Sequence, residues 1–467
     1  MSDHKPSPAQ RWFVLGLIVL FIALSGQYTI KILDPSGKRS AIMRWREQLL
    51  DLDRGENIYD RYVYPNPPIM ALALKPLADI DPGFVGALLW YYLKVGATLA
   101  SLYWVFRLVQ GGGLPFPAWA KALVVLLSLR PIMSDLTHGN VNLFILFLVT
   151  AGLYAFHKGR PVGGGLLLAL SIACKVTPAL FVPYLIWKRA WRALAGCAVG
   201  LVLFLWVVPS CFLGWEKNQE LLTSWTRHMI VPFLIDGEVT SSHENQSLPG
   251  LAARLLTHSP SFIDYDPLPP HGPRPQRYDN LLDLSLAAAS RLVKGAELLF
   301  VGLVVWRCRR PLAPRAGWRL AAEFSVIVLG MLLFSERTWK HHCVTLMLPF
   351  AVLCYYLSAC RPGFRLKCYL IGTLVVVTLL MASTSSVSSE KVNVPHFEQG
   401  WEAMSKTAQV YGVYVWAYLL LLAALGVVLG RKEESLTATE AEAISRARAL
   451  PALPVVSLQR DEVPCHS

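Results

Sequence analysis

Long apolar runs separated by short polar segments dominate the chain. A helix needs about 20 predominantly apolar residues to cross a bilayer, so each run of this length predicts a membrane span. The clear candidates are residues 12–33, 84–108, 117–134, 140–157, 191–213, 283–306, 319–335, 343–360, 367–385 and 408–430. This pattern predicts an all-α polytopic membrane protein.

One further apolar stretch, residues 162–187, is interrupted by Cys174-Lys175-Val176-Thr177-Pro178. A lysine in mid-membrane is costly unless it lines a polar cavity, and Pro178 frees a backbone carbonyl. We therefore predict two short helices that meet at a polar break. With this break, the chain has about twelve crossings.

Basic residues between the runs set the orientation, because short cytoplasmic loops are rich in Lys and Arg. With the N-terminus inside, the basic clusters near residues 158–160, 188–192, 307–319, 361–367 and 431–432 all fall inside. Four segments then lie outside, namely 34–83, 214–282, 335–342 and 386–407. We predict a transmembrane domain over 1–432 in the plasma (inner) membrane and a disordered cytoplasmic tail over 433–467.

Composition supports the membrane assignment. Hydrophobic residues make up 54% of the 467 residues and charged residues only 16%, whereas about a quarter of an ordinary soluble domain is charged. The net charge of +13 could indicate nucleic acid, but the charges sit mostly between apolar runs, so no nucleic-acid partner is expected. The nine cysteines form neither a CxxC nor a Cys/His metal spacing.

The first outer segment contains a predicted amphipathic helix over 40–54, ended by Gly55. Its apolar residues Ile42, Trp45, Leu49 and Leu52 form a narrow stripe. Arg44, Gln48 and Asp51 share the opposite face. Such a helix is expected to lie in the membrane interface, with its stripe on acyl chains.

Several polar residues have both a structural and a functional interpretation. Lys175 could pair with a carboxylate, or it could bind an anionic group such as phosphate. The short turn at 335–342 gathers Arg337, Lys340, His341 and His342, which suit either a solvated turn or phosphate contact. Two adjacent histidines do not share a helical face, so they do not indicate a metal site.

Amide side chains occur at two places on the predicted outer side. Asn140 and Asn142 open a span, where they suit either helix capping or hydrogen bonding to sugar hydroxyls. Asn245 and Gln246 lie in the long loop 214–282, where a turn explains them equally well.

Asp34 emerges directly from the first predicted span. The sequence Asp34-Pro35-Ser36-Gly37 is typical of a type I turn, which accounts for the aspartate without a function. A carboxylate at the outer surface could also act as a base on an acceptor hydroxyl.

Taken in order, these motifs resemble glycosyltransferase family 87, whose members have the GT-C architecture. The resemblance runs over most of residues 12–360. It includes Gly55-Glu56-Asn57-Ile58-Tyr59 followed by Tyr64-Pro65-Asn66-Pro67-Pro68, the pattern Gly139 to Asn142, Lys175-Val176-Thr177-Pro178, Asn245-Gln246-Ser247 and Trp339-Lys340-His341-His342.

The resemblance implies transfer of a hexose, usually mannose, from a polyprenyl-phosphate donor to a lipid or glycan acceptor on the extracytoplasmic face. It implies an inverting reaction with an aspartate base, for which Asp34 is the candidate and Asp51 the reserve. Asp34 lies about 21 residues before Gly55, farther than the family pattern usually has it. The cations named above would hold the phosphate, and Tyr64 with the four amide residues would contact substrate. The resemblance implies no metal or other cofactor.

Two other functions fit the same chain. A transporter or lipid flippase would use the broken helix at Lys175 and Pro178 as a midplane site, but no internal repeat supports it. A membrane acyl- or phosphotransferase would need a His or Ser motif that the sequence lacks. A polar cavity at the outer surface favours the transferase, and a closed midplane site favours transport.

Overall fold

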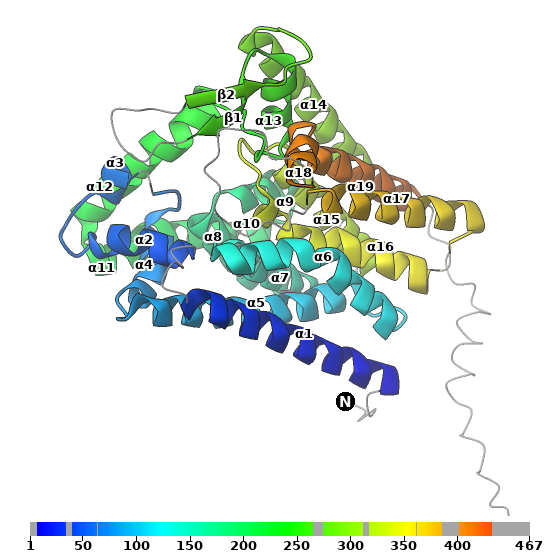
Figure 1. Cartoon of the computed structure of the whole chain (residues 1–467). Helices are drawn as coiled ribbons and strands as arrows, with labels where there is room; N and C mark the ends of the chain where they lie inside the picture. Colours follow the sequence, from blue (N-terminus) through cyan, green and yellow to red (C-terminus); the bar gives the residue numbers. More distant parts are fainter. Residues whose placement is uncertain are drawn as a thin grey trace, which may run out of the picture. The chain divides into compact units, whose positions relative to one another are not determined.

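The computed structural model describes residues 7–33, 40–62, 64–264, 274–311, 317–360, 362–384 and 401–431. The chain up to Leu429 forms one compact unit (Figure 1). Asp34, residues 386–400 of the fourth predicted outer segment and the predicted tail 433–467 lie outside the described residues.

Helices occupy every predicted apolar run, which confirms the all-α class. They are α1 (Pro8–Leu33), α5 (Gly83–Gln110), α6 (Ala118–His138), α7 (Asn142–His157), α8 (Pro161–Cys174), α9 (Phe181–Trp187), α10 (Trp191–Val202), α11 (Val208–Leu213), α14 (Leu286–Arg307), α15 (Trp318–Leu333), α16 (Met347–Ala359), α17 (Phe364–Ala382) and α19 (Val413–Gly430). A π-helical turn, η2 (Leu203–Val207), joins α10 to α11.

Short elements fill the segments between them. These are α2 (Ala41–Leu50), α3 (Ile58–Tyr62), α4 (Pro68–Ala78), α12 (Trp215–Trp225), the π-helix η3 (Thr226–Ile235), α13 (Leu248–Leu256), the 3-10 helix η4 (Lys340–Leu346) and α18 (Trp401–Val410). Strands β1 (Pro260–Asp264) and β2 (Arg274–Tyr278) form an antiparallel pair.

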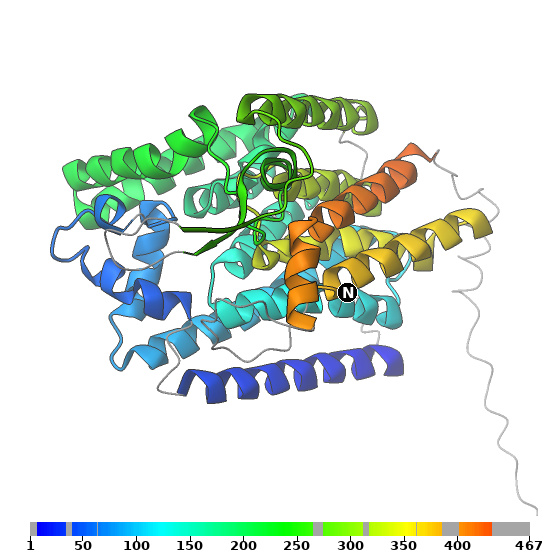
Figure 2. The same cartoon turned by 45° about the horizontal axis from the view of Figure 1, so that its top comes forward.

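Six helices in the described part of the chain are long and apolar enough to cross a bilayer. The first of them, α1, lies at the edge of the bundle (Figures 1 and 2). It leaves large apolar side chains such as Trp12 and Ile22 exposed, as expected of a helix that faces lipid. The count of about twelve crossings includes shorter helices and stays a prediction.

The predicted break in residues 162–187 is confirmed. Helix α8 ends at Cys174, Lys175 has an extended backbone, and the chain resumes as the 3-10 helix η1 (Thr177–Leu180). Pro178 lies in the first turn of η1, where its missing N–H leaves no helical bond unmade. Helix α9 follows directly.

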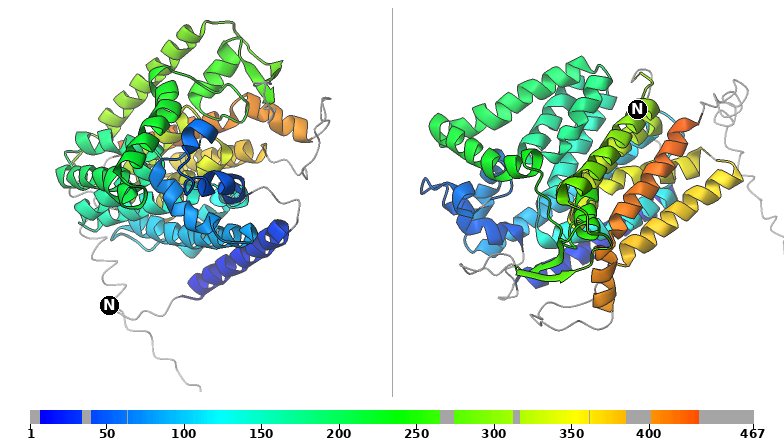
Figure 3. Two further views of the ribbon diagram at one scale, coloured as in Figure 1. Left: turned by 90° about the vertical axis from the view of Figure 1, so that its left-hand side faces the viewer. Right: turned by 90° about the horizontal axis from the view of Figure 1, so that it is seen from above.

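The described parts of all four predicted outer segments meet at one end of the bundle. Asn57 of the first donates to Glu220 of the second at 3.0 Å. The N–H of Gln246 donates to the carbonyl of Thr338 in the third at 2.6 Å. Lys406 of the fourth acts electrostatically on His243 of the second. Figure 2 shows α2 to α4 beside α12, and the right panel of Figure 3 shows the strand pair beside α18.

The opposite end gathers the other connections. Tyr355 near the end of α16 donates to the carbonyl of Leu114 at 2.9 Å, and Lys188 donates to that of Arg310 at 2.6 Å. Gly317 before α15 packs against the carbonyls that end α5. Several of these segments carry basic clusters, and the side of the membrane on which they lie stays a prediction.

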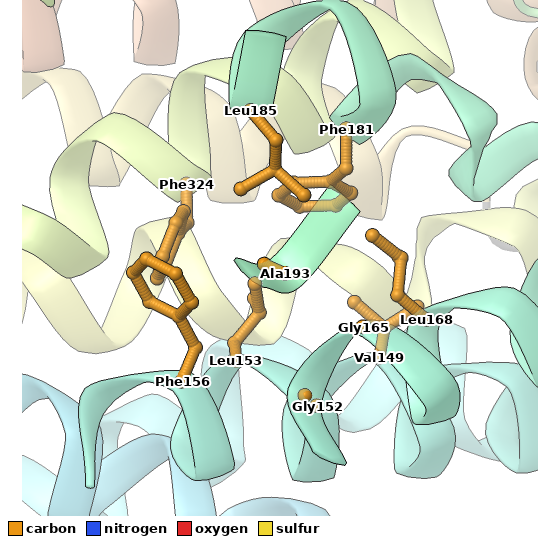
Figure 4. A pocket seen from close by; sticks show the side chains of 11 residues that line it. Val149, Gly152, Leu153, Phe156, Gly165, Leu168, Phe181, Leu185, Ala193 and Phe324 are labelled. Carbon is orange, nitrogen blue, oxygen red and sulfur yellow. The ribbon is translucent and has the colours of Figure 1, made fainter. Parts of the chain in front are cut away.

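Small residues let α7, α8 and α10 approach closely. A Cβ on Gly165 would lie 2.0 Å from the carbonyl oxygen of Ala193, and one on Gly196 would lie 2.3 Å from that of Val162. Such contacts are typical of helix pairs in membranes, where packing replaces the hydrophobic drive. A cavity of only about 20 Å³ remains at this junction, lined by Phe181, Phe324 and neighbouring apolar residues (Figure 4).

The predicted interfacial helix needs a correction. Helix α2 ends at Leu50, and Asp51 lies in the turn that follows. Ile42 and Leu49 of its apolar stripe are fully buried within the protein, where α2 packs on α4 and α5, so the stripe does not rest on acyl chains. Asp51 is buried as well, because Arg54, Arg61 and Tyr62 surround it.

We expect Gly165→Ala and Gly163→Ala, two changes on the same helix, to have opposite effects. The Cβ added at position 165 would collide with the α10 backbone, and overpacking of this kind costs about 1–3 kcal/mol. Position 163 has open space, and alanine there gains helix propensity of up to about 1 kcal/mol. Thermal unfolding in detergent measures both. Equal Tm values for the two variants would contradict this account of the α8–α10 contact.

Candidate functional site

Lys175 lies at one end of a buried series of hydrogen-bonded side chains. Its Nζ donates to Oδ1 of Asn142 at 2.5 Å, and Nδ2 of Asn142 donates to Oδ1 of Asp135 at 2.9 Å. Oδ2 of Asp135 accepts from Nζ of Lys94 at 3.4 Å. Lys94 and Asp135 are fully buried, whereas Lys175 is only half-buried. The bonds thus lead from the packed interior to Lys175, whose side chain is half-buried.

The turn between α6 and α7 meets the histidine turn beside this series of side chains. Nδ2 of Asn140 lies 2.9 Å from Nε2 of His341. The ring of His341 lies 5.5 Å from that of His138 and 4.7 Å from that of His342, centroid to centroid. Both His341 and His342 are within electrostatic range of Lys175. The structure therefore brings Asn142 together with four other predicted site residues, which are Asn140, Lys175, His341 and His342.

Gly139 lets the start of α2 join the same place. It has a φ of 70°, and a Cβ there would lie 2.5 Å from Oγ of Ser40. Its carbonyl accepts from the indole N–H of Trp90 at 2.8 Å. The close approach of Gly139 to Ser40 places the start of α2 beside the α6–α7 turn. Arg44, in the first turn of α2, then lies within electrostatic range of His341.

The remaining predicted cations divide between two places. Arg337 donates to Oγ1 of Thr240 at 3.2 Å and lies over the ring of Phe233, while acting electrostatically on His342. Lys340 instead donates to the carbonyl of Thr384 at 2.9 Å, which also accepts from Arg130 at 2.8 Å. Lys340 thus faces the end of α17, away from the group around Lys175.

The side chains of Asn245 and Gln246 join separate backbone segments by hydrogen bonds. Nδ2 of Asn245 donates to the carbonyls of Thr240 and Glu336 at 2.8 and 2.7 Å, and its Oδ1 accepts from two backbone N–H groups. Nε2 of Gln246 donates to two carbonyls as well. Both side chains are fully buried, so in this conformation their polar atoms are occupied by the backbone and not open to substrate.

Arg254 adds further hydrogen bonds between the same segments. The guanidinium is fully buried and donates to the carbonyls of Ser241, Ser242, Asn245, Gly250, Gln409 and Val410. Burial lowers the pKa of Arg254 to about 10, so it stays charged at neutral pH. One side chain thereby joins α13, the loop before it and the end of α18.

Of the three predicted site residues in the first outer segment, Tyr64 and Asp51 lie within the described residues, and both are packed away from solvent. Tyr64 is fully buried, with its ring 5.4 Å from Trp45 and 6.1 Å from Tyr59. Asp51 accepts from Tyr62 at 2.6 Å and pairs with Arg54 and Arg61. The hydrogen bond from Tyr62, followed by these arginines, lowers the pKa of Asp51 below its usual value. A carboxylate held in this way is a weaker base.

Two residues of the site, Lys94 and Asp135, were not predicted. A signal for them exists, because both are ionisable residues in or beside predicted spans, and such residues are functional by default. Lys94 lies inside the run 84–108, and Asp135 directly follows the run 117–134. Only the fold shows that they form one pair.

The charges around Lys175 are unbalanced. Among the described residues, Lys94, Lys175 and Arg337 act on this place, against the carboxylates of Asp135 and Glu336. The excess positive charge suits an anion such as a phosphate group. No cluster of three or more His, Cys, Asp or Glu that could hold a metal occurs in the part of the chain that the structure describes.

A larger cavity of about 1040 Å³ lies elsewhere, between α6, α16 and α17. Its lining is mostly apolar and includes Leu127, Cys354 and Leu374. None of the predicted site residues lines it.

The fold and the site thus define a helical membrane protein with a cation-rich polar site where its long connecting segments gather. The sequence profile of glycosyltransferase family 87 matches residues 64–336, more than half of the chain. The chain belongs to this family and is a glycosyltransferase.

Curated relatives are named mannosyltransferases. A polyprenol-phosphate-mannose-dependent alpha-(1-2)-phosphatidylinositol pentamannoside mannosyltransferase of Mycobacterium tuberculosis is 26% identical over 80% of this chain and 81% of its own length. A polyprenol-phosphate-mannose-dependent alpha-(1-2)-phosphatidylinositol mannoside mannosyltransferase of the same species is 27% identical over 61% of this chain and 60% of its own. No solved structure matches the chain significantly.

We expect Asn245→Asp to destabilise the protein strongly, although it changes only one group. A carboxylate there would face two carbonyls in place of two N–H···O bonds, at a cost of about 2–5 kcal/mol. Asn280→Asp is the matched control, since Asn280 donates a single bond near the surface. The Tm values of both variants in thermal unfolding test this stabilising role of Asn245. A normal Tm for Asn245→Asp would contradict it.

Proposed function

We propose that this protein transfers mannose from a polyprenyl-phosphate donor to a lipid or glycan acceptor on the extracytoplasmic face of the plasma membrane. The observation that carries the proposal is the cation-rich site around Lys175 in a family 87 enzyme. The relatives named above use a polyprenol-phosphate-mannose donor, and the anionic group of such a donor is its phosphate. Their acceptors are phosphatidylinositol mannosides, which suits a glycolipid acceptor here.

We infer the side of the membrane on which the site lies from the distribution of basic residues. The proposed domain covers 1–432, with both termini cytoplasmic and a cytoplasmic tail over 433–467. The site lies where the segments 34–83, 214–282 and 335–342 meet, at the end opposite the basic connections. The positive-inside rule assigns those connections to the cytoplasm and the site to the outside.

The proposed reaction is an inverting displacement. A base, for which Asp34 remains the candidate, takes the proton of the acceptor hydroxyl. The hydroxyl oxygen bonds to the anomeric carbon, the bond from that carbon to the phosphate oxygen breaks, and the electron pair stays on the phosphate. Negative charge grows on the phosphate during this step, so a fixed ammonium group at Lys175 stabilises the transition state. His341, His342 and Arg337 would assist.

Asp34→Asn tests the base. Asparagine keeps the shape but cannot accept the proton, so we expect mannosyl transfer to fall by about 100-fold or more. The assay is transfer of radiolabelled mannose from polyprenyl-phosphate-mannose to a membrane lipid extract by the purified protein. Asp81→Asn is the control, because Asp81 is an exposed residue of the same outer segment and should leave transfer unchanged. Full activity of Asp34→Asn would remove this residue from the mechanism.

We also propose that transfer needs no metal ion. Phosphate is already a good leaving group, and the side-chain cations supply the charge that a divalent ion would otherwise provide. Transfer is therefore expected to continue unchanged in EDTA. Loss of activity in EDTA, restored by added Mg²⁺ or Mn²⁺, would overturn this part of the proposal.

A further inference from the structure

The side chain of Asn142 connects two charged groups that do not touch. Its N–H₂ group donates to Asp135, and its carbonyl oxygen accepts from Lys175, at the distances given above. Asn142 is itself buried, at 6% exposure. Rotation of the amide by 180° would place its oxygen against the Asp135 carboxylate and its N–H₂ group against the ammonium. The two charges therefore fix the orientation of the amide.

Asp135 also has hydrogen-bond partners on its other side. Its Oδ2 accepts from Nζ of Lys94 and from the N–H of Leu143 at 3.3 Å, while Nζ of Lys94 also donates to the carbonyl of Asp135 at 2.7 Å. Bonds of this kind are strong in an apolar interior and leave few alternative geometries. The carboxylate is thus a rigid reference point between α5, α6 and α7.

The charges of Lys94, Asp135 and Lys175 do not cancel. Lys94 and Asp135 form a neutral pair with no exposed surface, whereas Lys175 is half-buried at the site. A pair that served only to join α5 and α6 would not need a bonded path to a third ionisable group. The path gives Lys175 a fixed position and leaves its positive charge for an incoming anion.

We propose that Asp135, acting through Asn142, is a positioning residue that holds the Lys175 ammonium group against the phosphate of the sugar donor. This inference rests on the proposed function. Lys94 compensates the charge of Asp135, which allows the carboxylate to stay ionised in the interior. Because the ammonium is held in place before the reaction, it need not reorganise as charge develops on the phosphate.

A double-mutant cycle with Asn142→Ala and Lys175→Ala tests the path. The purified variants are assayed with polyprenyl-phosphate-mannose, and kcat and KM are measured separately. If Asn142 acts only through Lys175, each single change lowers kcat by about 10-fold or more, with a smaller rise in KM. The double variant then has the kcat of Lys175→Ala alone. A kcat for the double variant equal to the product of the two separate losses would overturn the inference.

Thr150→Ala is the control for packing. Thr150 is buried on the same helix as Asn142, and its hydroxyl donates to carbonyls of that helix, so its removal should leave kcat unchanged. If Asn142→Ala does not fold, Asn142→Ser takes its place in the cycle. A loss of kcat in Thr150→Ala as large as that in Asn142→Ala would show a general packing effect and would contradict the inference.

The pair Lys94→Met with Asp135→Leu tests the carboxylate itself. Removing both charges together leaves no unpaired ion in the interior, and apolar replacements of buried ion pairs are often neutral for stability. We expect a folded protein whose kcat matches that of Asn142→Ala, with no further loss when Asn142→Ala is added. Wild-type kcat in the Lys94→Met, Asp135→Leu variant would overturn the role of Asp135.

If the wild-type protein transfers no mannose from this donor, the proposed function fails. If the wild-type protein is active and Lys175→Ala is equally active, only the positioning inference and the phosphate role of Lys175 fail.

Discussion

A positive charge inside an apolar helix bundle must be paired or hydrogen-bonded, and much of this structure is arranged around that requirement. Lys94 enters the interior on α5 and is compensated by Asp135 of α6. Asp135 in turn fixes Asn142 at the start of α7, and Asn142 fixes Lys175 at the break after α8. One series of hydrogen bonds thereby joins α5, α6, α7 and the end of α8. An isolated charge there would cost several kcal/mol, so the chain of bonds is a condition for placing an ammonium group at the site.

The segments around this site have little regular structure, and side-chain bonds to backbone carbonyls replace it. Arg254, Asn245 and Gln246 join the long second outer segment to the turn at 335–342 and to the end of α18. These bonds fix the turn that carries Arg337 and the two histidines. The proposed phosphate-binding groups therefore stand on a rigid support, even though they come from loops, and such support is what a site needs to keep its geometry.

The sequence predicts the helices well, because apolar length is a strong signal in a membrane protein. It also predicts the break at Lys175, since a charge and a proline interrupt one apolar run. The long-range contacts of Asn245 and Gln246 could not be predicted, because these partners are backbone groups about 90 and 160 residues away. The burial of Asp51 was missed for a similar reason. Its arginine partners and Tyr62 lie beyond the end of the helix, where helical periodicity no longer applies.

Direct observation of the donor phosphate tests the central claim, that Lys175 is the anchor for a lipid-linked sugar donor. An electron cryo-microscopy structure of the full chain with bound polyprenyl phosphate would locate this group. The account predicts a phosphate oxygen within hydrogen-bonding distance, about 3 Å, of Nζ of Lys175, with His341 and His342 beside it. A phosphate bound at the end of α17 near Lys340 and Arg130, with Lys175 unoccupied, would contradict the account.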